Sequence, residues 1–359
     1  MRRRRRKNQY VFAGEVPRSR GKSFLLGLLA VLAAGLLATL ITNFTLNNQV
    51  ALNKVSVTVQ NLPEDLENWS ILHITDLHGK EIGAGQGGIR KALSGVNYSS
   101  VVFTGDLIGP DGDVQPLLEV IALLATDKPK FLIPGDEDPS PYMSTAHDSL
   151  SVYAPWAQAV MDAGVTILDE PVSVQRGKST IWFTPEYLYS LDLGSLAAVY
   201  QRQLDDLSTF DILTPDQSAQ KRLAEHHLAR MERIGLAMDA MKEKDIQVVL
   251  THAPLTRSYV HTMLQWVDKK EIFSLRNAAV VLAGHYAGGQ WRMPWGGALY
   301  VPDYGWFPED TLITGFDYVN GIPQYISSGL AASAYYPWQP FRLFNQPEIA
   351  YVTLTARMN

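Results

Sequence analysis

Five short apolar runs, each followed by an acidic residue or a histidine, constrain this chain more than any other feature. The runs are bounded by turn residues, which is typical of strands buried on both faces of an α/β sheet. They cover residues 71–75, 101–104, 131–134, 246–251 and 278–283. Helix-like segments at 114–125 and 152–163 lie between some of them. The sequence therefore predicts an α/β fold.

Ligand sites in open α/β sheets lie beyond the carboxyl ends of the strands, so the residues that follow these runs are expected on one rim. They are Asp76, His78, Asp106, Asp136, His252 and His285. The chain has no cysteine, which excludes thiolate ligands, a thiolate nucleophile and disulfides. Oxygen and imidazole ligands suit Mn²⁺, Fe, Zn²⁺ or Mg²⁺. Taken singly, each residue reads as an ordinary loop residue, but five runs in register favour a metal site.

Glycine precedes Asp106 directly and permits close approach of the backbone, so this carboxylate can bridge two ions. A two-metal site polarises a phosphoryl oxygen and activates water for in-line attack. The pattern thus predicts a site that can hold two metal ions.

The same residues carry a resemblance to a known family. Asp76-x-His78, Gly105-Asp106, Gly135-Asp136-Glu137-Asp138, His252 and Gly284-His285-x-x-Gly-Gly-Gln resemble the ordered signature of the calcineurin-like metallophosphoesterases, and of their bacterial membrane-anchored subgroup in particular. The resemblance spans about residues 53–354 and is poor over 186–245. It implies a four-layer α-β-β-α sandwich and one or two bound divalent metal ions.

By this resemblance, Asp76 and His78 hold a first metal ion, and Asp106 bridges this ion and a second one. The second ion is also held by Asp136, His252 and His285. Three positions depart from the family pattern. Asp136 stands where the family has Asn, and Glu137 stands where it has the His thought to protonate the leaving group. Ala287 stands where it has the last His of the first site. Asp106 and Glu137 are the expected catalytic residues, and the departures predict weakened or altered chemistry.

The N-terminal part of the chain indicates a membrane anchor. Residues 1–22 sum to +8, which leaves −13 for the rest. This basic segment over 1–23 precedes an apolar stretch over 24–44, about 32 Å long as a helix and so long enough to cross a bilayer. Because cationic flanks stay in the cytoplasm, the C-terminal body is expected outside the membrane. The alternative is a cleaved signal peptide.

The body is expected over residues 54–359, after a linker over 45–53. Within it, 186–245 reads as an insertion that contains an amphipathic helix and a second helical stretch around 196–207. It is expected either to cap the metal rim and select substrate, to contact a second copy, or to form a small surface core. His226 and His227 are expected on its solvated face, and His73 is expected in the core.

Two functions from different classes remain open at this point. The first is a membrane-tethered, extracytoplasmic, metal-dependent phosphoesterase that hydrolyses a phosphate mono- or diester of the cell envelope, either a lipid or a polymer. The second is a catalytically impaired relative that binds a phosphorylated envelope ligand. A basic tip on an acidic body argues against nucleic acid as a partner, and the sequence leaves the oligomeric state open. Tyr335, Tyr336 and Trp338 are expected either to line a groove or to pack.

Overall fold

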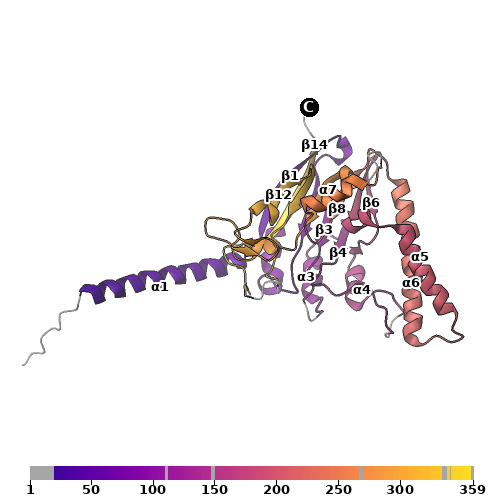
Figure 1. The fold of residues 1–359 in the computed structure, drawn as a ribbon. Coiled ribbons are helices and arrows are strands. Elements are labelled where there is room, and N and C mark those ends of the chain that lie inside the picture. The colour runs from indigo at the N-terminus through magenta and orange to yellow at the C-terminus, as the bar shows by residue number, and fades with distance from the viewer. Residues whose placement is uncertain are drawn as a thin grey trace, which may run out of the picture. The chain divides into compact units, whose positions relative to one another are not determined.

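The computed structural model describes residues 20–109, 112–146, 150–266, 271–333, 338–339 and 341–356. The chain divides into two compact units, Met1–Thr45 and Leu46–Asn359. All of the described part of the first unit belongs to helix α1 (Arg20–Asn47) (Figure 1). Its segment Gly21–Asn47 has a mean hydropathy of 2.6 and is long and apolar enough to cross a membrane. A signal sequence near the N-terminus has the same properties.

Two six-stranded sheets form the second unit, which we call the body. The first sheet has the order β1 (Ala51–Val59), β14 (Glu348–Ala356), β2 (Trp69–Ile74), β3 (Ser100–Thr104), β4 (Lys130–Ile133) and β5 (Thr166–Ile167). The second has the order β12 (Gly315–Val319), β13 (Ile322–Ile326), β9 (Ala278–Ala283), β8 (Ile246–Leu250), β7 (Ser179–Pro185) and β6 (Val172–Arg176). Strands β2 to β5 are parallel to one another, as are β7, β8, β9 and β13.

The main core lies between the two sheets. Apolar side chains from both inner faces meet there, and the rings of Phe131 and Phe183 stack with centroids 4.5 Å apart. Helices α2 (Gly87–Leu93), α3 (Gln115–Ala122) and α4 (Pro155–Asp162) pack on the outer face of the first sheet. Helices α6 (Pro215–Ala240) and α7 (Arg257–Trp266) pack on the outer face of the second. The four-layer α-β-β-α sandwich is thereby confirmed.

Most predicted elements appear with shifted ends. The helix-like segments 114–125 and 152–163 become α3 and α4, which are shorter. The segment predicted as a linker over 45–53 is mostly structured, because α1 continues to Asn47 and β1 begins at Ala51. Strand β1 forms this early because all nine of its residues pair in parallel with β14, which lies about 300 residues later.

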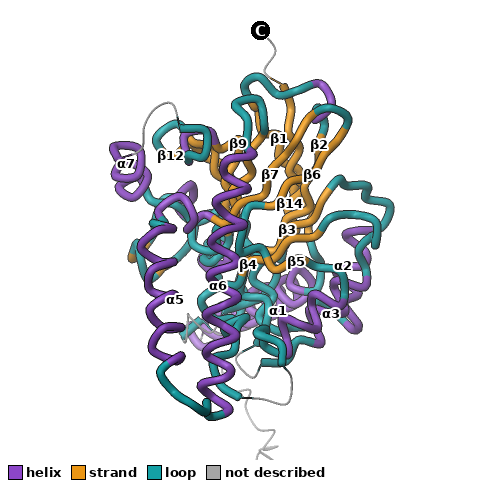
Figure 2. The backbone as a smooth tube through the Cα atoms, turned by 90° about the vertical axis from the view of Figure 1, so that its right-hand side faces the viewer, coloured by secondary structure: helices purple, strands orange, loops and turns teal. Residues whose placement is uncertain are grey.

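The segment 186–245 contains two helices, as predicted, and they form a helical hairpin. Helix α5 (Leu193–Ser208) lies beside α6 (Figure 2). The start of α6 is fixed by a capping box, in which Thr214 accepts a hydrogen bond from the backbone of Gln217 and the Gln217 side chain accepts one from Thr214. Met231 and Ile234 of α6 pack against Trp182 of β7. These apolar contacts attach the hairpin to the second sheet.

The expectation that His226 and His227 lie on a solvated face is wrong. His227 is 8% exposed and stacks on Tyr200, while both histidines contact the ring of Tyr142. Helical periodicity gives the face of a helix, but it does not show that a neighbouring loop covers that face. Tyr335 and Tyr336 lie outside the described residues, and Trp338 packs on Trp291 and Tyr300.

His73 is a fully buried core histidine, as predicted. Its Nε2 lies 2.7 Å from Thr104 Oγ1, and burial lowers its pKa to about 3. The unfolded chain therefore binds a proton at this side chain below about pH 6.5, while the folded chain does not. Stability that is present above pH 6.5 is lost as the pH falls towards 3, by about 2 kcal/mol at pH 5.

We predict that His73→Gln removes this loss. Between pH 7.5 and pH 5.0, the free energy of unfolding should fall about 2 kcal/mol less in the variant than in the parent protein. Urea titration followed by tryptophan fluorescence measures this difference, since all eight tryptophans lie in the body. Equal losses in the two proteins would contradict the assignment.

Candidate metal centre

The polar residues that follow the parallel strands meet at one edge of the sandwich. Asp76 and His78 follow β2, Asp106 follows β3, and Asp136 follows β4. His252 and His285 follow β8 and β9 of the second sheet. The two sheets thus present their carboxyl ends to the same rim, and the structure brings all six predicted residues together there.

Two clusters of possible metal ligands share one residue. The first contains Asp76, His78 and Asp106, and the second contains Asp106, Asp136, His252 and His285. Within each cluster, one ligand atom per residue lies within 4.8 Å of the others. His252 Nε2 lies 3.1 Å from Asp106 Oδ2 and 2.7 Å from Asp136 Oδ1, and His285 Nδ1 lies 3.2 Å from the same Asp136 oxygen. Asp106 is therefore placed to bridge.

The backbone around the centre is in conformations that need support from its neighbours. Asp76, His78, Asp106 and His285 all have positive φ angles between 48° and 78°. Such strain is stored where surrounding structure holds it, commonly at functional sites. Gly135 is needed because a Cβ there would overlap the Asp106 carboxylate. The strand ends therefore approach one another closely enough to gather the ligands.

Hydrogen bonds outside the clusters orient these side chains. His252 Nδ1 donates to the carbonyl oxygen of Thr104 at 2.7 Å, which leaves Nε2 facing the carboxylates. The backbone amide of Glu137 donates to Asp106 Oδ1 at 2.9 Å.

Asp138 plays a part that sequence reasoning missed. It accepts three backbone hydrogen bonds of 2.8–2.9 Å, from Leu107, Ile108 and Gly135. It thus ties together the loops that carry Asp106 and Asp136. The sequence signal for this part is its place in the Gly135–Asp138 motif, directly after Asp136 and Glu137.

The electrostatics of the centre fit a cation. Asp76 and Asp106 are at most 1% exposed, and the ion-pair partners of Asp76, Asp106 and Asp136 among the described residues are histidines. Burial raises the pKa of Asp76. Although burial lowers the pKa of His252, hydrogen bonds to Asp106 and Asp136 raise it well above its usual value. Buried carboxylates without Lys or Arg partners are costly unless a metal ion neutralises them.

Unpaired buried atoms support the same conclusion. Within the described part of the chain, Asp76 Oδ2 and His78 Nε2 are buried and have no hydrogen-bond partner. Native proteins rarely leave such atoms unsatisfied, and an ion is one accepted explanation. Hard oxygen and imidazole donors without sulfur fit Mn²⁺, Fe, Zn²⁺ or Mg²⁺.

A comparison with protein families gives the same answer. A profile of the calcineurin-like phosphoesterases matches residues 70–288, more than half of the chain. The chain belongs to the calcineurin-like phosphoesterase family. No curated protein matches it in sequence. Among solved structures, it is similar to the phosphopantetheinyl hydrolase of Mycobacterium tuberculosis, at 13% identity and a TM-score of 0.37, over 80% of this chain and 96% of that one.

Members of this family hydrolyse phosphoric esters, and the chain is classed with them. Two of its departures from the family pattern can be placed in the structure. Glu137 Oε2 lies 3.0 Å from His78 Nδ1, and Ser333 Oγ donates to Glu137 Oε1. Ala287 is fully buried, and its carbonyl oxygen accepts a hydrogen bond of 2.7 Å from Asn345. Glu137 therefore lies beside the first cluster, while the position of Ala287 supplies no ligand side chain.

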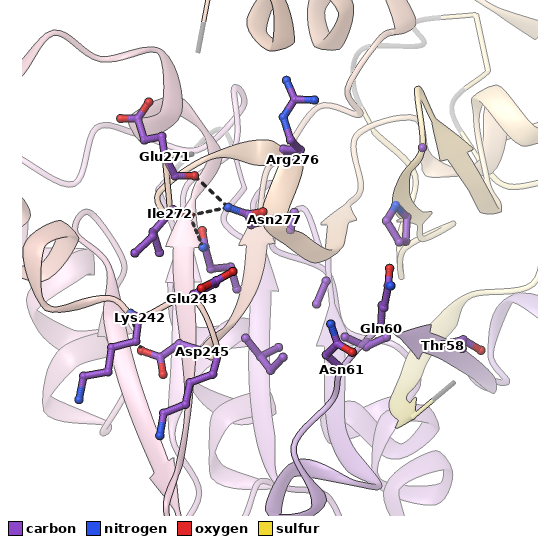
Figure 3. A pocket seen from close by; sticks show the side chains of 18 of the residues that line it. Thr58, Gln60, Asn61, Lys242, Glu243, Asp245, Glu271, Ile272, Arg276 and Asn277 are labelled. Carbon is purple, nitrogen blue, oxygen red and sulfur yellow. Dashed lines mark hydrogen bonds between the residues drawn. The ribbon is translucent and has the colours of Figure 1, made fainter. Parts of the chain in front are cut away.

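A second cavity of the body is not part of this centre. It measures about 1570 Å³ and lies at the amino ends of β8 and β9, the opposite edge of the second sheet (Figure 3). Its charged side chains balance in sign, with Lys242, Lys244 and Arg276 against Glu243, Asp245 and Glu271. Many of its polar groups bond to one another, as Asn277 does to the carbonyl oxygens of Glu271 and Ile272. We assign it no ligand.

We predict that Asp138→Asn weakens metal binding about 10- to 100-fold, the usual effect of losing a partner that orients ligands. The side-chain NH₂ group of the new Asn would face at least one of the three backbone N–H groups that now donate to the carboxylate, so at least one of these hydrogen bonds would be lost. Titration calorimetry with Mn²⁺ on the full-length protein in detergent measures the affinity. Asp127→Asn, at an exposed acid beside Lys128, is the matched control. Equal affinity in both variants would rule out the orienting role.

Proposed function

We propose that this chain is a membrane-tethered, metal-dependent phosphoesterase whose body lies outside the cytoplasm and hydrolyses a phosphate mono- or diester of the cell envelope. The observation that carries the proposal is the pair of ligand clusters that share Asp106. A carboxylate shared between two ligand sets can hold two ions close together, as two-metal phosphoester hydrolysis requires.

The proposed ligand sets follow the clusters. Asp76, His78 and Asp106 would hold one ion, and Asp106, Asp136, His252 and His285 would hold the other. When bound, divalent ions at this site polarise a phosphoryl oxygen and make water a better nucleophile. The protein's own contribution is to hold the ligands in place through the loop contacts of Asp138 and the tautomer of His252.

Glu137 is our candidate for handling the proton. Its side chain is 20% exposed, so it lies at the opening of the centre rather than inside it. Contacts to His78 and Ser333 fix its position, and a carboxylate there can orient water or give a proton to a leaving group. Unlike histidine, an acid with an ordinary pKa near 4.3 is mostly ionised at neutral pH, so proton donation by Glu137 would be less effective.

The anchor and its charges support the location. The basic segment before α1 favours a cytoplasmic N-terminus, which places the body on the other side of the membrane. Only residues 48–50 separate the end of α1 from the start of β1. Such a short connection favours a substrate at or near the membrane, either a phospholipid, a lipid-linked phosphate or an envelope polymer.

A second candidate is a binding module that recognises a phosphorylated envelope ligand without turnover. Glu137 and Ala287 favour it, because the family's acid and its last first-site histidine are both replaced. The second cluster would still hold one ion.

We predict that the full-length protein in detergent binds two divalent ions per chain and hydrolyses bis(p-nitrophenyl) phosphate with at least one of Mn²⁺, Fe²⁺, Zn²⁺ and Mg²⁺. Asp106→Asn removes the shared charge and should lower the rate on the order of 10³-fold, since a metal supplies several kcal/mol of transition-state stabilisation. Asp127→Asn is the control at an exposed site and should leave the rate unchanged. Bound ion without hydrolysis under any metal would favour the binding module.

We predict that a protease that reaches the outer side of the cell membrane, while that membrane stays intact, degrades the body and leaves α1 protected. The cationic residues of the N-terminal segment resist transfer across the membrane, which gives this orientation. Immunoblotting for the two ends of the chain measures it, and a cytoplasmic protein should survive the same treatment. Survival of the body would place it in the cytoplasm.

A further inference from the structure

A smaller cavity of about 500 Å³ adjoins the second ligand cluster. Asp136, His252 and His285 belong to its lining. Much of the remaining wall is apolar and comes from both sheets, with Ile133, Pro134, Leu168, Pro185 and Leu250 among its residues. A volume of this size and an apolar lining are typical of sites for small organic groups.

The insertion contributes one charged side chain to this cavity. Arg230 of α6 lines it and is only 7% exposed. Its Nη1 atom lies 3.4 Å from the hydroxyl of Tyr142 and 3.6 Å from Asp169 Oδ2. Among the described residues, its Nε has no hydrogen-bond partner.

These contacts leave Arg230 poorly satisfied. A guanidinium has five N–H donors, and a buried donor without an acceptor costs about 1–3 kcal/mol or more. The neighbouring Arg233 is different, because it donates to Glu170 at 2.7 Å and is 46% exposed. Arg230 therefore has unused hydrogen-bonding capacity and lines the cavity beside the metal centre.

The charges around Arg230 indicate what kind of acceptor fits. Besides the proposed metal ligand Asp136, two acids, Asp169 and Glu186, line the cavity, while Arg230 is the one Lys or Arg among the described lining residues. Burial raises the pKa of both acids. Asp169 also accepts a hydrogen bond from Tyr142 and pairs with Arg230, so the positive charge is already offset. An anion bound here would therefore meet no net positive charge. An uncharged acceptor such as a carbonyl oxygen needs no net positive charge and can accept a hydrogen bond from Arg230.

We propose that this cavity receives the organic group of the phosphoester, and that this group is uncharged, largely apolar and carries a carbonyl-type acceptor for Arg230. The inference rests on the proposed function, because it requires the phosphate to lie at the metal centre. It gives the 186–245 insertion a part in substrate selection. Arg230 is then a specificity-determining residue supplied by the hairpin.

Four phosphodiesters of p-nitrophenol test this proposal on the full-length protein with Mn²⁺. Their second groups are methyl, phenyl, 4-acetylphenyl and 4-carboxyphenyl. The value of kcat/KM should be higher for the phenyl ester than for the methyl ester, because the walls of the cavity are apolar. It should be about tenfold higher again for the 4-acetylphenyl ester than for the phenyl ester, mainly through a lower KM. The anionic 4-carboxyphenyl ester should be no better than the phenyl ester.

Arg230→Met should remove the tenfold advantage of the acetyl group and change kcat/KM for the methyl ester less than threefold. Arg230→Lys keeps the charge and should retain part of the advantage of the acetyl group. This second variant keeps the proposal testable if the Met variant does not fold. Arg233→Met, one turn along the same helix, is the matched control and should keep the preference. A preference that survives in both Arg230 variants, or a rate loss equal for all four esters, would overturn the proposal.

Binding separates this inference from the proposed hydrolysis. Calorimetry with 4-acetylphenyl phosphate and phenyl phosphate should show an Arg230-dependent preference for the acetyl compound. Such a preference without turnover of any ester would support the cavity assignment and overturn the proposed hydrolysis. Turnover without the preference would overturn the cavity assignment alone.

Discussion

Negative charge gathered at the carboxyl ends of the strands, with no Lys or Arg partner among the described residues, is the constraint on which this structure depends. Asp76 and Asp106 are buried beside Asp136, and the described ion-pair partners of all three are histidines rather than Lys or Arg. Carboxylates so placed repel one another and have lost most of their hydration. The strained backbone of the rim, the glycines that allow close approach and the amide donors around Asp138 all serve to hold them there. A bound cation makes this arrangement favourable.

The sequence was sufficient to predict the rim because parallel strands impose it. Apolar runs that end in Asp or His place those side chains at one edge once the strands are parallel, and β2, β3 and β4 are parallel in the first sheet, as are β8 and β9 in the second. The same logic predicted the buried strands and His73 in the core. The roles of Asp76, His78 and the other ligands remain proposals that follow from this geometry.

Tertiary contacts were beyond the reach of sequence patterns. Nothing in the sequence around Asp138 shows that its carboxylate accepts hydrogen bonds from three backbone amides in two different loops. Ser333 lies 196 positions from Glu137, yet it fixes that side chain. Helical spacing described the insertion as amphipathic, but its buried face includes Arg230 and His227 as well as Met231 and Ile234. The burial of a polar residue on a packed helix face can be predicted only when the surface that packs against it is known.

The pairing of β1 with β14 affects how the chain acquires its structure. Strand β14 lies between β1 and β2, so the segment that follows α1 cannot enter its sheet until a region about 300 residues later has been synthesised. Contacts this distant slow folding, because a long loop must close before the pairing is gained. During synthesis, the edge of β2 that β14 later covers stays open, and an unpaired edge invites association with other chains. A chain exported while still unfolded would pass through this vulnerable stage beyond the membrane.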